Sequence, residues 1–168
     1  KRLEQELKYQ AGHDPLTGLL NRRAFEGMLE QELRRANRYG TPFCLVMFDL
    51  DRFKVVNDTY GHDVGDEVLV TLVARVKERL RDTDLLARWG GEEFMALLPE
   101  TDGGGALELA EEVRVKVAAE PFPRVGRVTI SLGVAEYRHG EAEKALIKRV
   151  DEALYAAKDA GRNRTVGA

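Results

Sequence analysis

Two aspartates close the longest apolar run of the chain. Asp49 and Asp51 follow residues 43–48 and are separated by a single leucine. Because side chains alternate along a β-strand, a strand ending here would direct both carboxylates to the same face. Adjacent carboxylates repel one another unless a cation neutralises them, and oxygen ligands of this kind suit Mg²⁺. Since Asp is also a common turn residue, the pair indicates either a metal site or a turn at the strand end.

A second acidic pair follows two glycines. The Gly-Gly-Glu-Glu segment 90–93 lies between the apolar segments 85–89 and 94–98, which predicts a β-hairpin because both glycines can adopt positive φ. By itself the segment indicates a solvated turn. If the hairpin adjoins the apolar strand, a hairpin glutamate could approach Asp49, and the glycines would allow a phosphate to approach the backbone closely. The combination predicts a metal and phosphate site.

Helical and strand periodicities predict the elements that must hold these residues. Apolar residues recur at helical spacing over 25–36, 68–80, 106–117 and 146–157, whereas 43–50, the hairpin and 128–134 have strand patterns. Turn and cap residues separate these elements: segments 14–18 and 103–105, Gly40, Gly61, Gly65, Asp102 and Gly161. The order β-α-β-β-α-β, then a helix, is typical of the ferredoxin-like fold. We therefore expect an α+β domain with a central, mainly antiparallel sheet flanked by helices, a fold that by itself does not decide function.

The length indicates one domain. A chain of 168 residues buries roughly 70% of the surface that its unfolded form exposes. Residues 1–12 are too short for a domain, but Leu3 and Leu7 lie four residues apart among charged neighbours, as on an amphipathic helix. We interpret residues 1–12 as the end of a helix that arrives from an upstream region.

The composition excludes several classes of protein. The longest apolar run is far shorter than the roughly 20 residues of a membrane span, and nothing resembles a signal peptide, so we expect a soluble domain. Cys44, the single cysteine, lies in that run without a disulfide partner, which indicates a buried thiol and a reducing, cytoplasmic compartment. The formal net charge of −3 argues against binding a nucleic-acid polymer. A missing upstream region could still tether the full-length protein to a membrane.

Several segments together resemble one known family, the GGDEF-domain diguanylate cyclases. The family's signature hairpin corresponds to Arg-Trp-Gly-Gly-Glu-Glu-Phe at 88–94, and segments 14–23, 49–66 and 155–163 are similar to other family motifs. Four separated motifs in the right order are far more specific than one. The resemblance implies a palm-type GGDEF domain over residues 13–168, preceded by the end of a signalling or dimerisation helix over residues 1–12.

The resemblance implies the metal ligands and the catalytic groups. In the family, the metal is held by groups that correspond here to Asp49, the backbone carbonyl of Leu50 and Glu92, with Mg²⁺ or Mn²⁺ as the ion. Asp51 is then a weaker candidate for a ligand. Glu93 would orient the attacking hydroxyl or remove its proton.

The resemblance also implies how guanine is recognised, through Asn57 and Asp66. A carboxylate can accept hydrogen bonds from both N1–H and the exocyclic amino group of guanine, a donor pair that adenine lacks. This chemistry independently favours GTP. Without the resemblance, Asn57 is typical of a turn and Asp66 of a helix cap.

Phosphate contacts are implied in three places. They are the backbone amides just after Asp49, represented here by Phe53, the glycines of the hairpin, Gly90 and Gly91, and the cations Lys54, Lys158 and Arg162. His62 corresponds to a frequent family residue near the nucleotide. From the residues alone, Lys158 and Arg162 could instead complement a helix C-terminus, and His62 could be an ordinary loop residue.

Arg81 and Asp84 form an Arg-x-x-Asp motif, and five residues, 85–89, separate Asp84 from Gly90. The spacing resembles the family's inhibitory product site, where arginine can meet a phosphate or stack on guanine and aspartate can accept from the guanine edge. The alternative is a charged turn between a helix and a strand.

The implied activity is that of a diguanylate cyclase. Two GTP-loaded domains form a homodimer and condense two GTP into cyclic di-GMP and two pyrophosphates, with product inhibition at the Arg-x-x-Asp motif and control by an upstream regulatory domain. A catalytically silent GGDEF receptor for GTP or cyclic di-GMP is one alternative, although such domains usually have a broken hairpin motif. A ferredoxin-like RNA-binding module is another, but it would require exposed aromatic residues on the sheet and a basic face.

Overall fold

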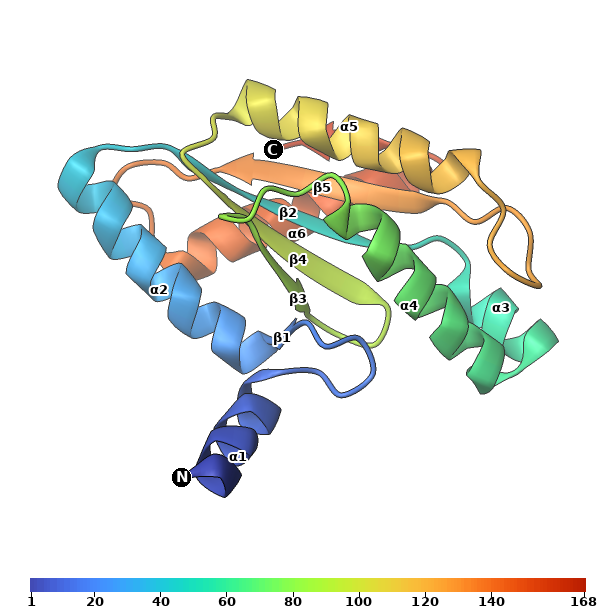
Figure 1. Cartoon of the computed structure of the whole chain (residues 1–168). Coiled ribbons are helices and arrows are strands. Elements are labelled where there is room, and N and C mark those ends of the chain that lie inside the picture. Colours follow the sequence, from blue (N-terminus) through green and yellow to red (C-terminus); the bar gives the residue numbers. More distant parts are fainter.

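The computed structural model describes residues 1–168 as one α+β unit of six helices and six strands (Figure 1). Three of these twelve elements were not predicted from the sequence: two edge strands of two and three residues, and one short helix. The elements in chain order are α1 (Arg2–Gly12), β1 (Leu20–Asn21), α2 (Arg22–Tyr39), β2 (Phe43–Leu50), α3 (Phe53–Tyr60), α4 (His62–Lys77), β3 (Leu85–Arg88), β4 (Glu93–Pro99), α5 (Gly103–Ala119), β5 (Ile130–Glu136), α6 (Glu143–Asp159) and β6 (Thr165–Gly167).

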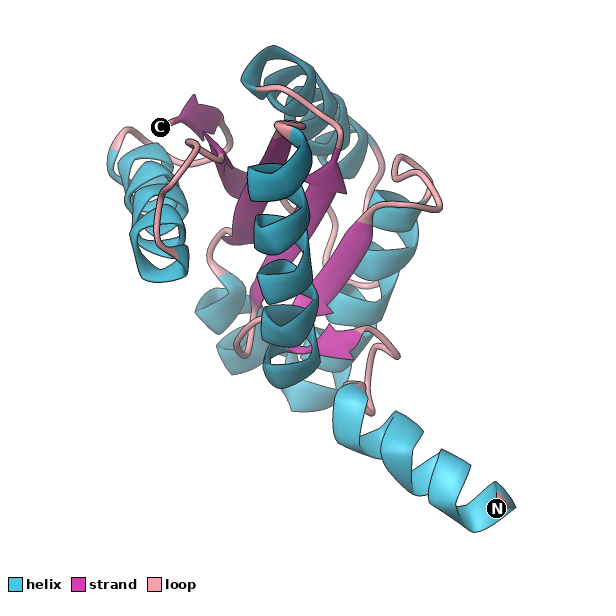
Figure 2. Cartoon of the chain, turned by 90° about the vertical axis from the view of Figure 1, so that its left-hand side faces the viewer, coloured by secondary structure: helices cyan, strands magenta, loops and turns pink.

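The sheet has the strand order β1-β3-β4-β2-β5-β6. Its four inner strands are antiparallel, with β2 between β4 and β5, whereas β1 and β6 add parallel pairings at the two edges. The inner strands and the helices α4 and α5 reproduce the predicted β-α-β-β-α-β order, and helices cover both faces (Figure 2). The predicted ferredoxin-like fold is therefore confirmed.

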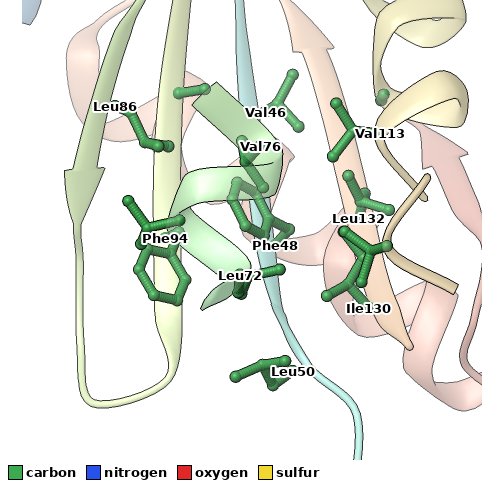
Figure 3. Packing of buried hydrophobic residues seen from close by; sticks show 14 of the residues in the cluster. Val46, Phe48, Leu50, Leu72, Val76, Leu86, Phe94, Val113, Ile130 and Leu132 are labelled. Atoms are coloured by element: carbon green, nitrogen blue, oxygen red, sulfur yellow. The ribbon is translucent and has the colours of Figure 1, made fainter. Parts of the chain in front are cut away.

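The central strand β2 is buried along its whole length because hydrophobic residues cover both of its faces. Val46, Phe48 and Leu50 join the larger hydrophobic cluster, which contains side chains of α4 and α5 (Figure 3). Leu45 and Met47 join a second cluster with α2 and α6. The alternation assigns Asp49 to the α6 face, which decides which helix can reach its carboxylate.

Most predicted helix ends are confirmed, and one turn is not. Gly40 ends α2 with φ 70°, as expected for a left-handed capping residue. Asp102 is the N-cap of α5 and accepts from the backbone N–H of Gly105 at 2.8 Å. The three glycines at 103–105, which we expected to form a flexible turn, are instead the first turn of α5. A well-placed cap stabilises the helix despite the low helix propensity of glycine.

Two predicted boundaries are wrong for local reasons. The helix expected to reach Leu80 ends at Lys77, because Arg79 and Leu80 donate to carbonyls three residues back and tighten the chain, while Leu80 still packs on the core. The strand expected from Val128 begins at Ile130. Val128 is buried outside the strand.

Helix α6 lies against β5 at Gly133. A side chain there would bring a Cβ atom 2.4 Å from the backbone nitrogen of Leu154 and 2.6 Å from the carbonyl oxygen of Val150. Only glycine permits this contact between backbones.

Helix α1 is confirmed as a helix but contains no buried residue, and it projects from the body of the domain (Figures 1 and 2). Its apolar side chains Leu3, Leu7 and Tyr9 are exposed. None of the helices has the length and apolar character needed to cross a membrane.

Candidate active site

The acidic strand end is built around Asp49, which is 4% exposed. In the sheet register, Asp49 lies opposite Glu93 of β4 and Ser131 of β5. Its Oδ2 atom contacts the Nζ atom of Lys158, which reaches it from α6. Burial raises the pKa of Asp49 to about 6; the contact with Lys158 opposes this rise, and the nearby charges of Glu93 and Asp51 add to it. The site thus contains a carboxylate whose charge requires a cation close by.

Asp51 has a different environment, although it is directed to the same side of the sheet as Asp49. Its carboxylate accepts hydrogen bonds from Thr129 Oγ1 at 2.7 Å, Ser131 Oγ at 2.6 Å and the backbone N–H of Asn163 at 3.0 Å. These donors satisfy a buried carboxylate without a metal. Asp51 therefore ties the segment after α6 to β5.

The predicted hairpin is present, but the reason given for it is wrong. Neither Gly90 nor Gly91 has positive φ. The backbone N–H groups of Trp89 and Gly90 both donate to the carbonyl of Glu93, at 2.8 and 3.1 Å, so that two residues of one strand oppose one of the other, as in a β-bulge. Glu92 is exposed in the turn and forms no ion pair or hydrogen bond.

The carboxylates expected at the metal are only partly assembled. Asp49 and Glu93 are neighbours across two strands, whereas Glu92 lies in the turn beside them. No group of three His, Cys, Asp or Glu side chains is arranged to hold a metal ion. The ligand set implied by the family resemblance uses only two carboxylates and the Leu50 carbonyl, so this finding does not test it.

A brace that the sequence analysis missed supports the hairpin. Arg88 donates from Nε and Nη2 to the carbonyl of Gly91, at 3.0 and 2.8 Å, and from Nη1 to Asp14 Oδ1 at 3.2 Å. Asp14 also accepts from the N–H and the hydroxyl of Thr17, at 2.8 and 2.7 Å. Burial by itself raises the pKa of Asp14. The hydrogen bonds from Thr17 and the charge of Arg88 together outweigh this effect, so that the pKa of Asp14 lies below its ordinary value. The segment after α1 is thereby connected to the signature turn.

The proposed guanine residues lie on two consecutive helices, Asn57 in α3 and Asp66 in α4. The Oδ1 atom of Asn57 is buried without a hydrogen-bond partner, and a Cβ atom at Gly65 would come within 1.9 Å of it. Asp66 is exposed and lies inside α4, whose N-cap residue is Gly61. The alternatives of a turn for Asn57 and a cap for Asp66 are therefore wrong.

The start of α3 offers backbone donors. Phe53 is buried in the core, whereas Lys54 is exposed. Both precede Val55, whose N–H donates to the carbonyl of Arg52 at 3.0 Å, and no side chain caps this helix. The first N–H groups of a helix that no side chain caps favour the binding of anions.

The remaining candidates for phosphate contacts differ in their environment. His62 begins α4 and is exposed. Arg162 follows the end of α6 with φ 66°, and its side chain forms no ion pair. Lys158, in contrast, is already paired with Asp49. Lys158 therefore does more than balance the partial negative charge at the C-terminus of α6, because it also pairs with a carboxylate of the sheet.

The Arg-x-x-Asp motif forms a closed local network. Arg81 Nη2 donates to Asp84 Oδ1 at 3.0 Å, to the Pro99 carbonyl at 2.8 Å and to Thr101 Oγ1 at 2.8 Å. Asp84 Oδ2 accepts the backbone N–H of Arg81 at 2.8 Å. An open cavity of about 400 Å³, which Leu80 also lines, borders both side chains.

The fold and the site together define a ferredoxin-like α+β domain with an acidic, lysine-neutralised strand end beside a glycine hairpin. Residues 11–164 match the family model described as diguanylate cyclase, GGDEF domain. The chain therefore belongs to the GGDEF diguanylate cyclase domain family.

Named relatives agree with this assignment. The chain is 47% identical to diguanylate cyclase DgcM of Escherichia coli (strain K12) over 168 residues, which cover 100% of the chain and 41% of DgcM. It is 46% identical over 160 residues to response regulator PleD of Caulobacter vibrioides, covering 92% of the chain and 35% of PleD. The chain thus spans about two-fifths of the length of these curated relatives.

A solved structure has the same fold. The coiled coil and GGDEF domain of DgcB from Caulobacter crescentus, in complex with c-di-GMP, superposes with a TM-score of 0.95 at 34% identity, covering 99% of this chain and 91% of that one.

Proposed function

We propose that this chain is the catalytic domain of a diguanylate cyclase, which condenses two GTP into cyclic di-GMP and two pyrophosphates. The observation that carries the proposal is the pairing of Asp49 with Glu93 across β2 and β4, next to a glycine turn and a lysine. DgcM, a diguanylate cyclase by name, is 47% identical over the whole chain.

The donor set fits a hard divalent cation. The buried carboxylate of Asp49 has acidic neighbours and already needs a cation in contact with it. Asp49, the Leu50 carbonyl and Glu92 would hold Mg²⁺ or Mn²⁺, since oxygen atoms are the preferred ligands of both ions. When bound, the ion would neutralise phosphate charge and lower the pKa of the attacking hydroxyl.

The nucleotide would extend from the α3 and α4 helices to α6. The unpaired acceptor of Asn57 and the exposed carboxylate of Asp66 would receive the donors of guanine. Phosphates would meet the first N–H groups of α3 at Phe53, with Lys54, His62, Gly90, Gly91, Lys158 and Arg162 around them. Each domain would hold one GTP and half of the reaction.

In the reaction, the 3′-hydroxyl of each GTP attacks the α-phosphorus of the GTP on the other subunit of a homodimer. Two P–O bonds form, two bonds to pyrophosphate break, and each hydroxyl loses its proton. Glu93 orients that hydroxyl or accepts the proton, because its carboxylate adjoins Asp49. Holding the two reactants in position supplies much of the acceleration.

Regulation would use the remaining parts of the chain. Arg81 and Asp84 would bind cyclic di-GMP as an inhibitory product once Arg81 leaves its protein acceptors. Residues 1–12 would be the end of a signalling or dimerisation helix, because α1 presents exposed apolar side chains. We assign the domain to the cytoplasm, where its substrate GTP is held.

The test is incubation with GTP and Mg²⁺, followed by chromatographic identification of the nucleotide product at several protein concentrations. We expect cyclic di-GMP and pyrophosphate, and a specific activity that rises with protein concentration because two domains must meet. Incubation with ATP is the control. GTP binding without any product would instead favour a silent receptor.

A further inference from the structure

Lys158 and Asp49 have no other charged or hydrogen-bonded side-chain partner than each other. The Lys158 Nζ atom contacts Asp49 Oδ2, and neither group forms a further hydrogen bond or ion pair. The two side chains differ in access: that of Asp49 is 6% exposed and that of Lys158 is 34% exposed. The lysine is therefore the more accessible member of the pair.

Asp51 shows that this lysine is specific for Asp49. Asp51 lies two residues away on the same side of the sheet, yet Thr129, Ser131 and Asn163 donate hydrogen bonds to it and no cation contacts it. Asp49 receives no such donors. A buried carboxylate without donors requires a counter-charge, which Lys158 alone supplies.

The proposed function requires both members of this pair for other partners. Asp49 must hold the cation, and Lys158 must meet a phosphate, so the pair has to separate before catalysis. A divalent cation arriving alone would have to displace a lysine that has no new anion to bind. A cation arriving with a triphosphate exchanges both partners at once, because Lys158 then gains a phosphate as Asp49 gains the metal.

We propose that the ammonium group of Lys158 occupies the place of the metal ion on Asp49, and that it thereby makes the binding of metal and nucleotide mutually dependent. The inference rests on the proposed function, because it takes Asp49 as a metal ligand and Lys158 as a phosphate contact. Coupling between two ligands is reciprocal, so each must tighten the binding of the other by the same factor.

Arg162 provides a matched control for Lys158. It lies four residues further along, is also expected to contact phosphate, and has no carboxylate partner. Removing either cation should weaken nucleotide binding, but only the removal of Lys158 should free Asp49 for a metal.

The experiment is a titration of the chain with Mn²⁺, followed by the electron paramagnetic resonance signal of free Mn²⁺. It is performed alone and with a GTP analogue whose α,β-bridging oxygen is replaced by methylene, so that no reaction occurs. In the wild type we expect weak binding of Mn²⁺ alone and binding tighter by about tenfold or more with the analogue, within the range of measured couplings. Lys158→Met should bind Mn²⁺ alone about tenfold more tightly than the wild type, and the analogue should then tighten Mn²⁺ binding by a smaller factor than in the wild type, because only its direct contact with the ion remains. Arg162→Met should bind Mn²⁺ alone as the wild type does.

Two results would overturn the inference while leaving the proposed function intact. One is a folded Lys158→Met protein in which the analogue tightens Mn²⁺ binding by the same factor as in the wild type. The other is a folded Lys158→Met protein that binds Mn²⁺ alone no more tightly than the wild type. If Lys158→Met does not fold, Lys158→Gln, which removes the charge and keeps a long polar side chain, takes its place in both comparisons. If the wild type binds no Mn²⁺ even with the analogue, the proposed metal site is wrong, and the role proposed for Lys158 is wrong with it.

Discussion

Two ion pairs lie near opposite ends of β4, and each contains the groups expected to meet a guanine nucleotide. At the hairpin end, Lys158 and Asp49 contact only each other. At the other end, Arg81 and Asp84 belong to a network in which the guanidinium also binds the Pro99 carbonyl and Thr101 Oγ1. The Asp84 side chain is wholly buried, and it accepts a backbone N–H as well.

The difference concerns what a ligand must displace. A phosphate that binds Lys158 replaces one protein contact, whereas a ligand that takes the guanidinium of Arg81 replaces three acceptors. Hydrogen bonds that are exchanged rather than added contribute little net affinity. The Lys158–Asp49 pair is therefore easier for a ligand to exchange than the Arg81 network, which holds the turn before β3 until a ligand with several acceptors competes for it.

We expect the largest effect on turnover from removing a proposed metal ligand at the hairpin end of the sheet. Asp49→Ala and Glu92→Ala should each lower turnover by about 1000-fold or more, because a bound metal supplies several kcal/mol of charge stabilisation. The fold should persist, since neither change opens an apolar cavity. Formation of cyclic di-GMP and thermal unfolding are the measurements. Asp51→Ala is the control and should lower the unfolding temperature, because Asp51 holds three donors. Wild-type turnover in either of the first two variants would exclude that residue from catalysis.

The next effect concerns which base the active-site end selects. Asp66→Ala should weaken the binding of a non-cleavable GTP analogue by about 10- to 100-fold, as expected when hydrogen bonds to a charged acceptor are lost. The corresponding ATP analogue should bind about as weakly as before, because adenine lacks the donor pair. Calorimetric titration with both analogues is the measurement, and equal losses for the two would contradict a role in recognising guanine.

Disrupting the Arg-x-x-Asp network should have a smaller effect, which concerns inhibition by the product. Arg81→Ala should weaken cyclic di-GMP binding by about tenfold, because the arginine fork is lost, and the product concentration that halves the initial rate should rise accordingly. The KM for GTP should change little, since Arg81 lies away from the proposed GTP contacts. Initial rates with added cyclic di-GMP, compared with the wild type, are the measurement. Inhibition at the same product concentration in both proteins would reduce the motif to a charged turn.

The smallest effect tests the brace that joins the hairpin to the segment after α1. Asp14→Asn should lower the free energy of unfolding at pH 7 by about 1 kcal/mol, the typical contribution of a hydrogen bond. Because the folded pKa of Asp14 lies below its ordinary value, its stabilisation is present above that value and is lost as the pH falls through the folded pKa. Denaturant unfolding at pH 7 and at about pH 3 should therefore show a smaller difference between variant and wild type at the lower pH. A difference that stays constant with pH would mean that the charge of Asp14 does not matter.

The regular elements could be predicted because their apolar periodicity is set locally. The helices α2, α4, α5 and α6 and the four inner strands all follow such patterns. The strands β1 and β6 are only two and three residues long and exist because a neighbouring strand pairs with them, as Leu20 does with Ala87. The helix α3, at eight residues, is too short to show a clear period.

Residue types and motif order propose the residues of the site, but they do not indicate the contacts that these residues make. Nothing local indicates that Lys158 reaches Asp49, or that Arg88 meets Asp14, 74 residues away. The position of Arg88 two residues before the glycine pair was the available signal, since a long cationic side chain beside a turn can bind the turn's carbonyls. The hairpin itself was predicted for the wrong reason, because a bulge at Trp89 and Gly90, and not positive φ, closes it.

The contact at Gly133 has a consequence for how this domain tolerates change. Any side chain at that position would act as a wedge under α6, since its Cβ atom would meet the backbone of the helix at 2.4 Å. Lifting the helix by about an ångström would carry Lys158 and Arg162 with it, and a displacement of that size can cost about 100-fold in rate. Gly133 has no functional group of its own, yet it sets how closely α6 packs on the sheet and therefore where Lys158 and Arg162 lie. A substitution as small as Gly133→Ala would therefore lower the reaction rate without removing any group that contacts the substrate.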